Sequence, residues 1–147
     1  MPLKLQISED MKSAMRSKDS ERLGTIRLLL AAIKQNEIDK RVELIDEDIV
    51  LIIEKMLKQR RDSIEAFDKA NRKDLVGKEK LEIKVLQDYM PQQFTEDEVE
   101  KFIIDAIEAS GAKSMKDMGT VMGILKPKLA GKANMADVSK KIKIKFT

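Results

Sequence analysis

Two glycines and a group of lysines near the C-terminus have the types and spacing to bind a phosphate backbone. The glycines are four residues apart, so in a helix they share one face and leave it without side chains. Another backbone could approach such a face closely, and the lysines would neutralise phosphates. A glycine inside a helix costs about 1 kcal/mol relative to Ala, so two glycines in one helix need a reason. Close packing between helices of the protein itself is the alternative reason for the glycines. The residues concerned are Gly119, Gly123, Lys126, Lys128, Gly131 and Lys132.

Arg60 is a second candidate, because it falls on the apolar side of a long predicted helix. At 100° per residue, Ile53, Met56 and Arg60 lie nearly on one line. A charge that projects from an apolar stripe needs a partner. One interpretation is an ion pair between helices with Glu37 or Glu82. The alternative is an arginine that binds a phosphate or a carboxylate in a groove.

Other charged runs are less specific. The lysines at positions 140–145 lie at the end of a predicted helix, where cations complement the helix dipole. They would form an RNA-facing patch only if they shared a face with Lys132. The acidic runs at 46–48 and 96–98 fall in first helical turns, where acids stabilise helices. We therefore predict neither a metal site nor a carboxylate pair for acid–base catalysis.

The composition excludes several classes of enzyme. The 147 residues contain no Cys and no His, so thiol nucleophiles, imidazole bases and the usual transition-metal ligands are absent. No phosphate-binding glycine loop is present either. We predict no catalytic residues and no cofactor. The net charge of +3 favours an anionic partner, and without an apolar run long enough for a membrane we expect a cytoplasmic protein.

The charged and aliphatic composition, with only 3% aromatics, predicts an all-α protein. Four helices are expected before Pro91, and this proline should end the first domain because the residue before it avoids helical geometry. Thr95 and Glu98 have the spacing of a capping box, and Ser114 with Asp117 has a weaker form of it. We predict an antiparallel long-helix domain over 1–91 and a small three-helix bundle over 92–147. Brief alternation at 141–146 is the only competing strand pattern.

Several segments resemble a known family. The run MGTVMG at 118–123 and the turn GKAN at 131–134 resemble the tail domain shared by YqeY proteins and the B subunit of tRNA-dependent amidotransferases. The family more often has Asp where this chain has Asn134, and both residues cap helices. The first domain resembles YqeY proteins at RLLLAAIKQ (27–35) and KQRRDSI (58–64), and the junction does so at YMPQQ (89–93).

The resemblance implies a function linked to tRNA. The tail of the amidotransferase is understood to contact the elbow of the bound tRNA, and the matching positions here are Gly119, Gly123, Gly131 and Lys132. A similar domain is appended to glutaminyl-tRNA synthetase in some bacteria. The protein is therefore expected to be a non-catalytic tRNA-associated module, with an amidotransferase or an aminoacyl-tRNA synthetase as a further partner.

Two alternatives belong to other classes. Family membership also suggests a carbon–nitrogen ligase that uses glutamine as amide donor. Amide transfer needs a nucleophile to release ammonia and a site to activate the acceptor, and the sequence shows neither. The other alternative is an adaptor whose helical arm binds a synthetase or another subunit.

Overall fold

The computed structural model describes residues 1–147 and contains seven α-helices, one short 3-10 helix and no strand. The all-helical prediction is confirmed, and the alternation at 141–146 falls at the end of a helix whose last residue is Lys145. The chain divides into two compact units, Met1–Met90 and Pro91–Thr147. This boundary lies one residue before the predicted one, and it coincides with the proline that cannot continue a helix.

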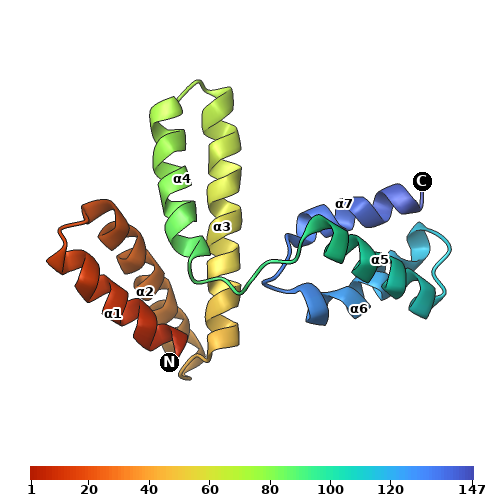
Figure 1. Cartoon of the computed structure of the whole chain (residues 1–147), viewed down its shortest axis with the longest axis horizontal. Coiled ribbons are helices and arrows are strands. Elements are labelled where there is room, and N and C mark those ends of the chain that lie inside the picture. The colour runs from red at the N-terminus through yellow and green to blue at the C-terminus, as the bar shows by residue number, and fades with distance from the viewer. The chain divides into compact units, whose positions relative to one another are not determined.

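The N-terminal unit consists of two helical hairpins (Figure 1). The first pairs α1 with α2, and the second, longer one pairs α3 with α4. The Asp19 side chain begins α2 by accepting from the Arg22 amide at 3.2 Å. At the base of α3, Asp46 accepts from the Leu3 amide at 3.0 Å and so joins the two hairpins. The bounds are α1 Leu3–Arg16, α2 Ser20–Lys40, α3 Asp46–Lys69 and α4 Lys73–Gln87.

The core of this unit lies where the two hairpins meet. Ile26 and Leu29 from α2, Ile49 and Ile53 from α3, and Leu86 from α4 are completely buried there. Full burial of side chains of this size contributes about 1.5–3 kcal/mol each. The outer half of α3 packs only along α4, so its apolar side chains are less buried than those at the base.

A buried tyrosine closes the end of α4. The Tyr89 hydroxyl donates to the Asp10 carboxylate of α1 at 2.6 Å. Burial, and then this hydrogen bond, raise the pKa of Tyr89 above its ordinary value. The contact therefore fixes the end of the unit just before Pro91.

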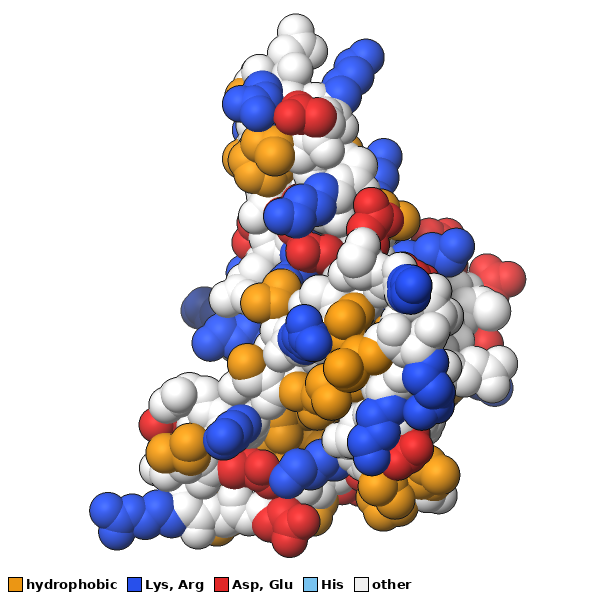
Figure 2. Space-filling model, turned by 90° about the vertical axis from the view of Figure 1, so that its left-hand side faces the viewer, with side chains coloured by type: hydrophobic (Ala, Val, Ile, Leu, Met, Phe, Trp, Pro, Cys, Tyr) orange, Lys and Arg blue, Asp and Glu red, His pale blue; other side chains and the backbone are white.

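Hydrophobic side chains are not all buried. Leu5, Leu28 and Leu51 are each about half exposed. On the face of the molecule in Figure 2, hydrophobic side chains gather in a central group bordered by Lys and Arg side chains.

The C-terminal unit packs three α-helices around a second core. Val121, Leu125 and Leu129 of α6 are completely buried, and Ile103 of α5 and Ile142 of α7 pack in the same cluster. The 3-10 helix η1 lies between α5 and α6. The bounds are α5 Glu96–Ser110, η1 Met115–Asp117, α6 Met118–Leu129 and α7 Met135–Lys145.

Two of the three predicted caps in this unit are confirmed. Thr95 and Glu98 exchange hydrogen bonds of 3.2 Å at the start of α5, which is the predicted capping box. Asn134 accepts from the Ala136 amide at 3.0 Å and begins α7. The predicted cap by Ser114 is wrong, because its side chain makes no capping hydrogen bond. The chain forms η1 there instead, and the Asp117 carboxylate accepts from the Lys113 amide at 2.9 Å.

Candidate nucleic-acid interface

The two glycines of α6 form an open strip on the surface of the C-terminal unit. Gly119 and Gly123 are exposed, and a Cβ added at either position would have no atom within 4 Å. The helix packs on the core through its other side, which carries Val121 and Leu125. Close helix–helix packing as the reason for these glycines is therefore wrong. The strip is free for approach from outside the unit.

The lysines of α6 do not all share the glycine strip. At 100° per residue, Lys126 lies about 20° from Gly119 around the helix, whereas Lys128 lies about 180° from it. Both side chains are exposed, and neither forms an ion pair. Lys126 can therefore act together with the glycines on one ligand, while Lys128 faces another direction.

The turn that carries Gly131 and Lys132 is held in place by the segment before α5. Gly131 is buried and has a φ of +75°, which favours glycine. Its carbonyl accepts from the Gln93 side chain at 2.7 Å. The Phe94 amide donates to the Lys132 carbonyl at 2.9 Å. These bonds fix the backbone that presents the Lys132 side chain.

Phe94 also contacts the charged end of Lys132. The ammonium lies 5.6 Å from the ring centroid, and a second ring, Phe102, lies 4.9 Å from Phe94. At an exposed site a cation over an aromatic ring gains about 0.5–1 kcal/mol, which leaves Lys132 able to pair with a phosphate. The sequence did not indicate these roles for Gln93 and Phe94. The only signal was the match of Gln93 to the family junction.

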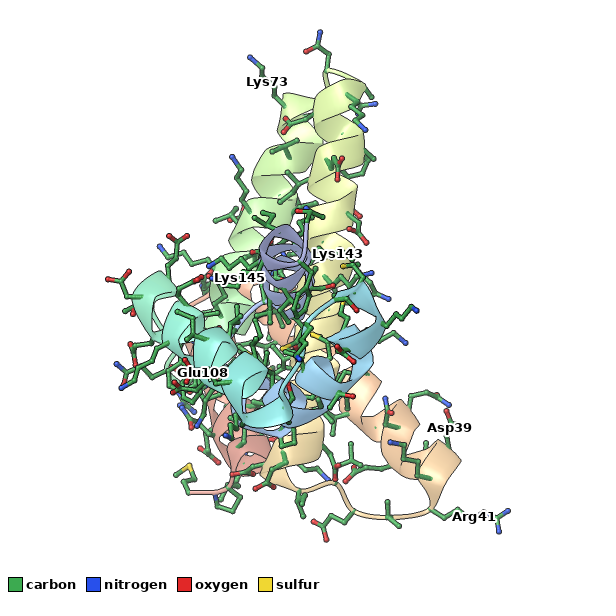
Figure 3. The ribbon with its side chains drawn as sticks, turned by 90° about the vertical axis from the view of Figure 1, so that its right-hand side faces the viewer. Asp39, Arg41, Lys73, Glu108, Lys143 and Lys145 are labelled. Carbon is green, nitrogen blue, oxygen red and sulfur yellow. The ribbon has the colours of Figure 1, made fainter.

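Charge is divided between the helices of this unit. Residues 112–147 contain nine lysines and two aspartates, whereas residues 91–111 contain six acidic residues and one lysine. Figure 3 shows Glu108 on α5 and Lys143 and Lys145 on α7. Lys145 pairs with Glu100 of α5, while Lys140 and Lys143 form no ion pair. The cationic part of the unit is thus α6, α7 and the turn between them.

Arg60 forms the interhelix ion pair that was one of its two interpretations. Its Nε donates to the Glu82 carboxylate of α4 at 3.0 Å, and a second nitrogen donates to the Met56 carbonyl at 3.1 Å. Both charged side chains are mostly buried, at 13% and 14% exposure. The guanidinium is therefore engaged within the α3–α4 hairpin.

Glu37 is not the partner of Arg60. It pairs with Lys4 of α1 at 2.8 Å and accepts from the Leu44 amide at 3.0 Å. The bond from Lys4 and then the bond from Leu44 hold the pKa of Glu37 below its ordinary value. Of the two carboxylates considered as partners of Arg60, Glu82 is the one that pairs with it, because α1 places Lys4 beside Glu37.

No group of three or more acidic side chains is placed to hold a metal ion. None of the helices is both long enough and apolar enough to cross a membrane.

Comparison with known proteins gives one family. The model of the family described as Yqey-like protein matches residues 4–146. Similar curated proteins carry the name "Altered inheritance of mitochondria protein 41, mitochondrial". The protein of Vanderwaltozyma polyspora is 40% identical over 78% of this chain and 65% of its own length. That of Eremothecium gossypii is 46% identical over 57% of this chain and 46% of its own length.

A longer match is found with the protein of the same name from Pyrenophora tritici-repentis. It is 34% identical over 93% of this chain and 77% of its own length. The match to the first two relatives spans between about half and two thirds of their length. These names place the relatives in mitochondria, which differs from the cytoplasmic location predicted for this chain.

Proposed function

The chain belongs to the Yqey-like protein family, and from that premise we propose that it is a non-catalytic accessory module that docks on tRNA through its C-terminal unit. One observation carries the proposal. The strip of Gly119 and Gly123 faces open space although each glycine weakens the helix, and Lys126 lies on the same side. No part of the protein packs against the two glycines, so the surface beside them has room for the backbone of another molecule.

The mode of docking follows from the residue types. Lysines without ion pairs neutralise phosphates, and the glycine strip lets the sugar–phosphate backbone come close to the helix. No aromatic or amide side chain lies along the strip to stack on bases or to read their edges. Recognition therefore depends on the shape of a folded RNA. The tRNA elbow suits this mode, because its shape is shared by tRNAs of different sequence.

The proposal does not include amide transfer by this chain alone. The glutamine-dependent carbon–nitrogen ligase reaction needs a nucleophile and a site for the activated acceptor. The residues of the strip supply neither. In this proposal an amidotransferase or an aminoacyl-tRNA synthetase would act on the tRNA that the module holds. The compartment, cytoplasm or mitochondrion, would decide which tRNAs are available.

Binding of the purified protein to total tRNA across a salt titration tests the proposal. We expect micromolar affinity that falls steeply between about 50 and 200 mM salt. Lys126→Ala and Lys132→Ala should each lower the slope of log K against log salt by about 0.9, the value for one phosphate contact. Lys128→Ala should leave the slope unchanged, because its side chain faces away from the glycine strip.

Two controls separate this docking from general attraction. Lys78→Ala removes one exposed lysine from α4 of the N-terminal unit and should not change the slope. An unstructured RNA of the same length should bind more weakly than tRNA if shape is recognised. The proposal fails if tRNA does not bind at low salt, or if all four lysine variants lower the slope equally.

A further inference from the structure

An open groove of about 350 Å³ lies between α2 and α3 of the N-terminal unit. The C-terminal half of α2, which ends near Asp39 and Arg41, diverges from α3 in the view of Figure 3. Ala32 of α2, Leu44 of the connection, and Ile52 and Met56 of α3 contribute apolar groups to the groove. The volume is at the lower end of the range of about 300–1,000 Å³ that is typical of small-molecule pockets.

Two lysines give the groove a positive charge. Lys40 lines it from α2 and Lys55 from α3, and both side chains are exposed. Neither forms an ion pair with an acidic side chain. The only acidic residue that lines the groove is Asp48, which accepts from the Ile45 amide at 3.2 Å at the start of α3. The groove thus combines apolar groups with two unneutralised ammonium groups.

A further apolar side chain extends the groove toward solvent. Leu51 lines it and is 55% exposed. Met56, which lies deeper, has a flexible side chain that adapts to different apolar partners. Aliphatic side chains of this kind bind the apolar face of an amphipathic helix, whose anchors recur every three or four residues. The groove contains no aromatic residue on which a base could stack.

We propose that this groove binds an acidic amphipathic helix of a protein partner. Leucine-like anchors of that helix would contact Ile52 and Met56, and its acidic residues would pair with Lys40 and Lys55. The proposal goes beyond the tRNA docking above, because it concerns the N-terminal unit and residues that take no part in the glycine strip. It gives this unit a binding role of its own.

Two synthetic peptides of about 15 residues, a length at which an isolated helix begins to form in water, test the charge and the face together. Both carry leucines at i, i+3, i+4 and i+7, and one has glutamates on the flanks where the other has lysines. The full chain should bind the glutamate peptide about tenfold more tightly than the lysine peptide. The methyl NMR signals of Ile52 and Met56 should shift on binding.

Charge reversal gives the sharpest control. The double variant Lys40→Glu/Lys55→Glu should prefer the lysine peptide, because the sign of the groove has changed. The variant Lys34→Glu/Lys84→Glu has the same change in net charge, removes two exposed lysines that do not line the groove, and should keep the original preference. Circular dichroism shows whether each variant is folded.

Three results would overturn the proposal. The first is that neither peptide shifts the groove methyl signals. The second is that tRNA shifts them, which would assign the groove to RNA. The third is that they shift on concentrating the protein alone, which would make a second copy of the chain the occupant. None of these results bears on the lysines of α6, so the tRNA proposal is tested separately.

Discussion

A larger share of the cationic side chains pairs with an acidic residue in the N-terminal unit, at least seven of nineteen, than in the C-terminal unit, where most lysines have no acidic partner. At least seven ion pairs lie within residues 1–90. The C-terminal unit has the pair of Lys145 with Glu100, although it contains ten lysines. The first unit uses much of its charge for its own structure. The second keeps all but one of its ten lysines free of acidic partners.

The largest change in stability that we expect from this contrast follows substitution of Glu82. Glu82→Ala should lower the free energy of unfolding of the N-terminal unit by about 3 kcal/mol, because Arg60 would remain mostly buried without its carboxylate. The double variant Arg60→Met/Glu82→Leu should recover most of this loss, since it removes both charges. Urea unfolding followed by circular dichroism measures both. A full loss in the double variant would mean that packing, not charge, explains the effect.

The glycines of the C-terminal unit should respond in opposite directions. Gly131→Ala should destabilise the unit by about 1–2 kcal/mol, because its φ is positive. Gly123→Ala should stabilise it by about 0.5–1 kcal/mol, because the new Cβ meets open space and alanine favours the helix. Thermal unfolding shows whether each variant is less or more stable than the wild type.

The same Gly123→Ala variant separates folding from binding. If the strip contacts tRNA, the added methyl group should weaken binding although the protein is more stable. Unchanged tRNA affinity in a stabilised Gly123→Ala protein would remove this part of α6 from the interface.

A smaller effect is expected at the only tyrosine. Tyr89→Phe removes the hydrogen bond to Asp10 and should cost about 1 kcal/mol. Because burial and Asp10 raise the pKa of Tyr89, its hydroxyl contributes stability that is complete below pH 10 and is lost as the pH rises through the higher folded value. The wild type should therefore lose more stability than Tyr89→Phe as the pH rises above about 10. Equal losses in both proteins would show that other groups cause the alkaline effect.

The smallest effect on stability is expected from the free lysines. Lys126→Ala and Lys128→Ala should each change the free energy of unfolding by no more than about 0.5 kcal/mol, because their side chains are exposed and unpaired. The measurement is urea unfolding at the same ionic strength as for Glu82→Ala. A loss above about 1 kcal/mol would contradict the contrast between the two units.

Features that depend on neighbouring residues were predictable from the sequence. The capping box of Thr95 and Glu98 and the boundary at Pro91 arise from a few residues, and the structure has the box where it was predicted. The same reasoning failed at Ser114, since a matching pattern also allows a 3-10 turn. Local patterns therefore identify helices better than they identify the exact form of a helix end.

Features that depend on tertiary contacts were not predictable in the same way. The choice of Glu82 over Glu37 for Arg60 requires knowing that α1 brings Lys4 to Glu37. The bond from Gln93 to Gly131 joins residues 38 positions apart. Whether the α6 glycines face a neighbouring helix or solvent likewise depends on how the three helices pack.

The bond from Gln93 to Gly131 also determines where the C-terminal unit can be cut. A fragment that begins at Thr95 would keep every helix of the unit but lose both the Gln93 and Phe94 contacts to the turn. A fragment that begins at Pro91 would keep them. The second fragment is thus the one that could be fused to another protein with its turn intact. Residues 91–94 therefore belong to the folded C-terminal unit and are not a linker.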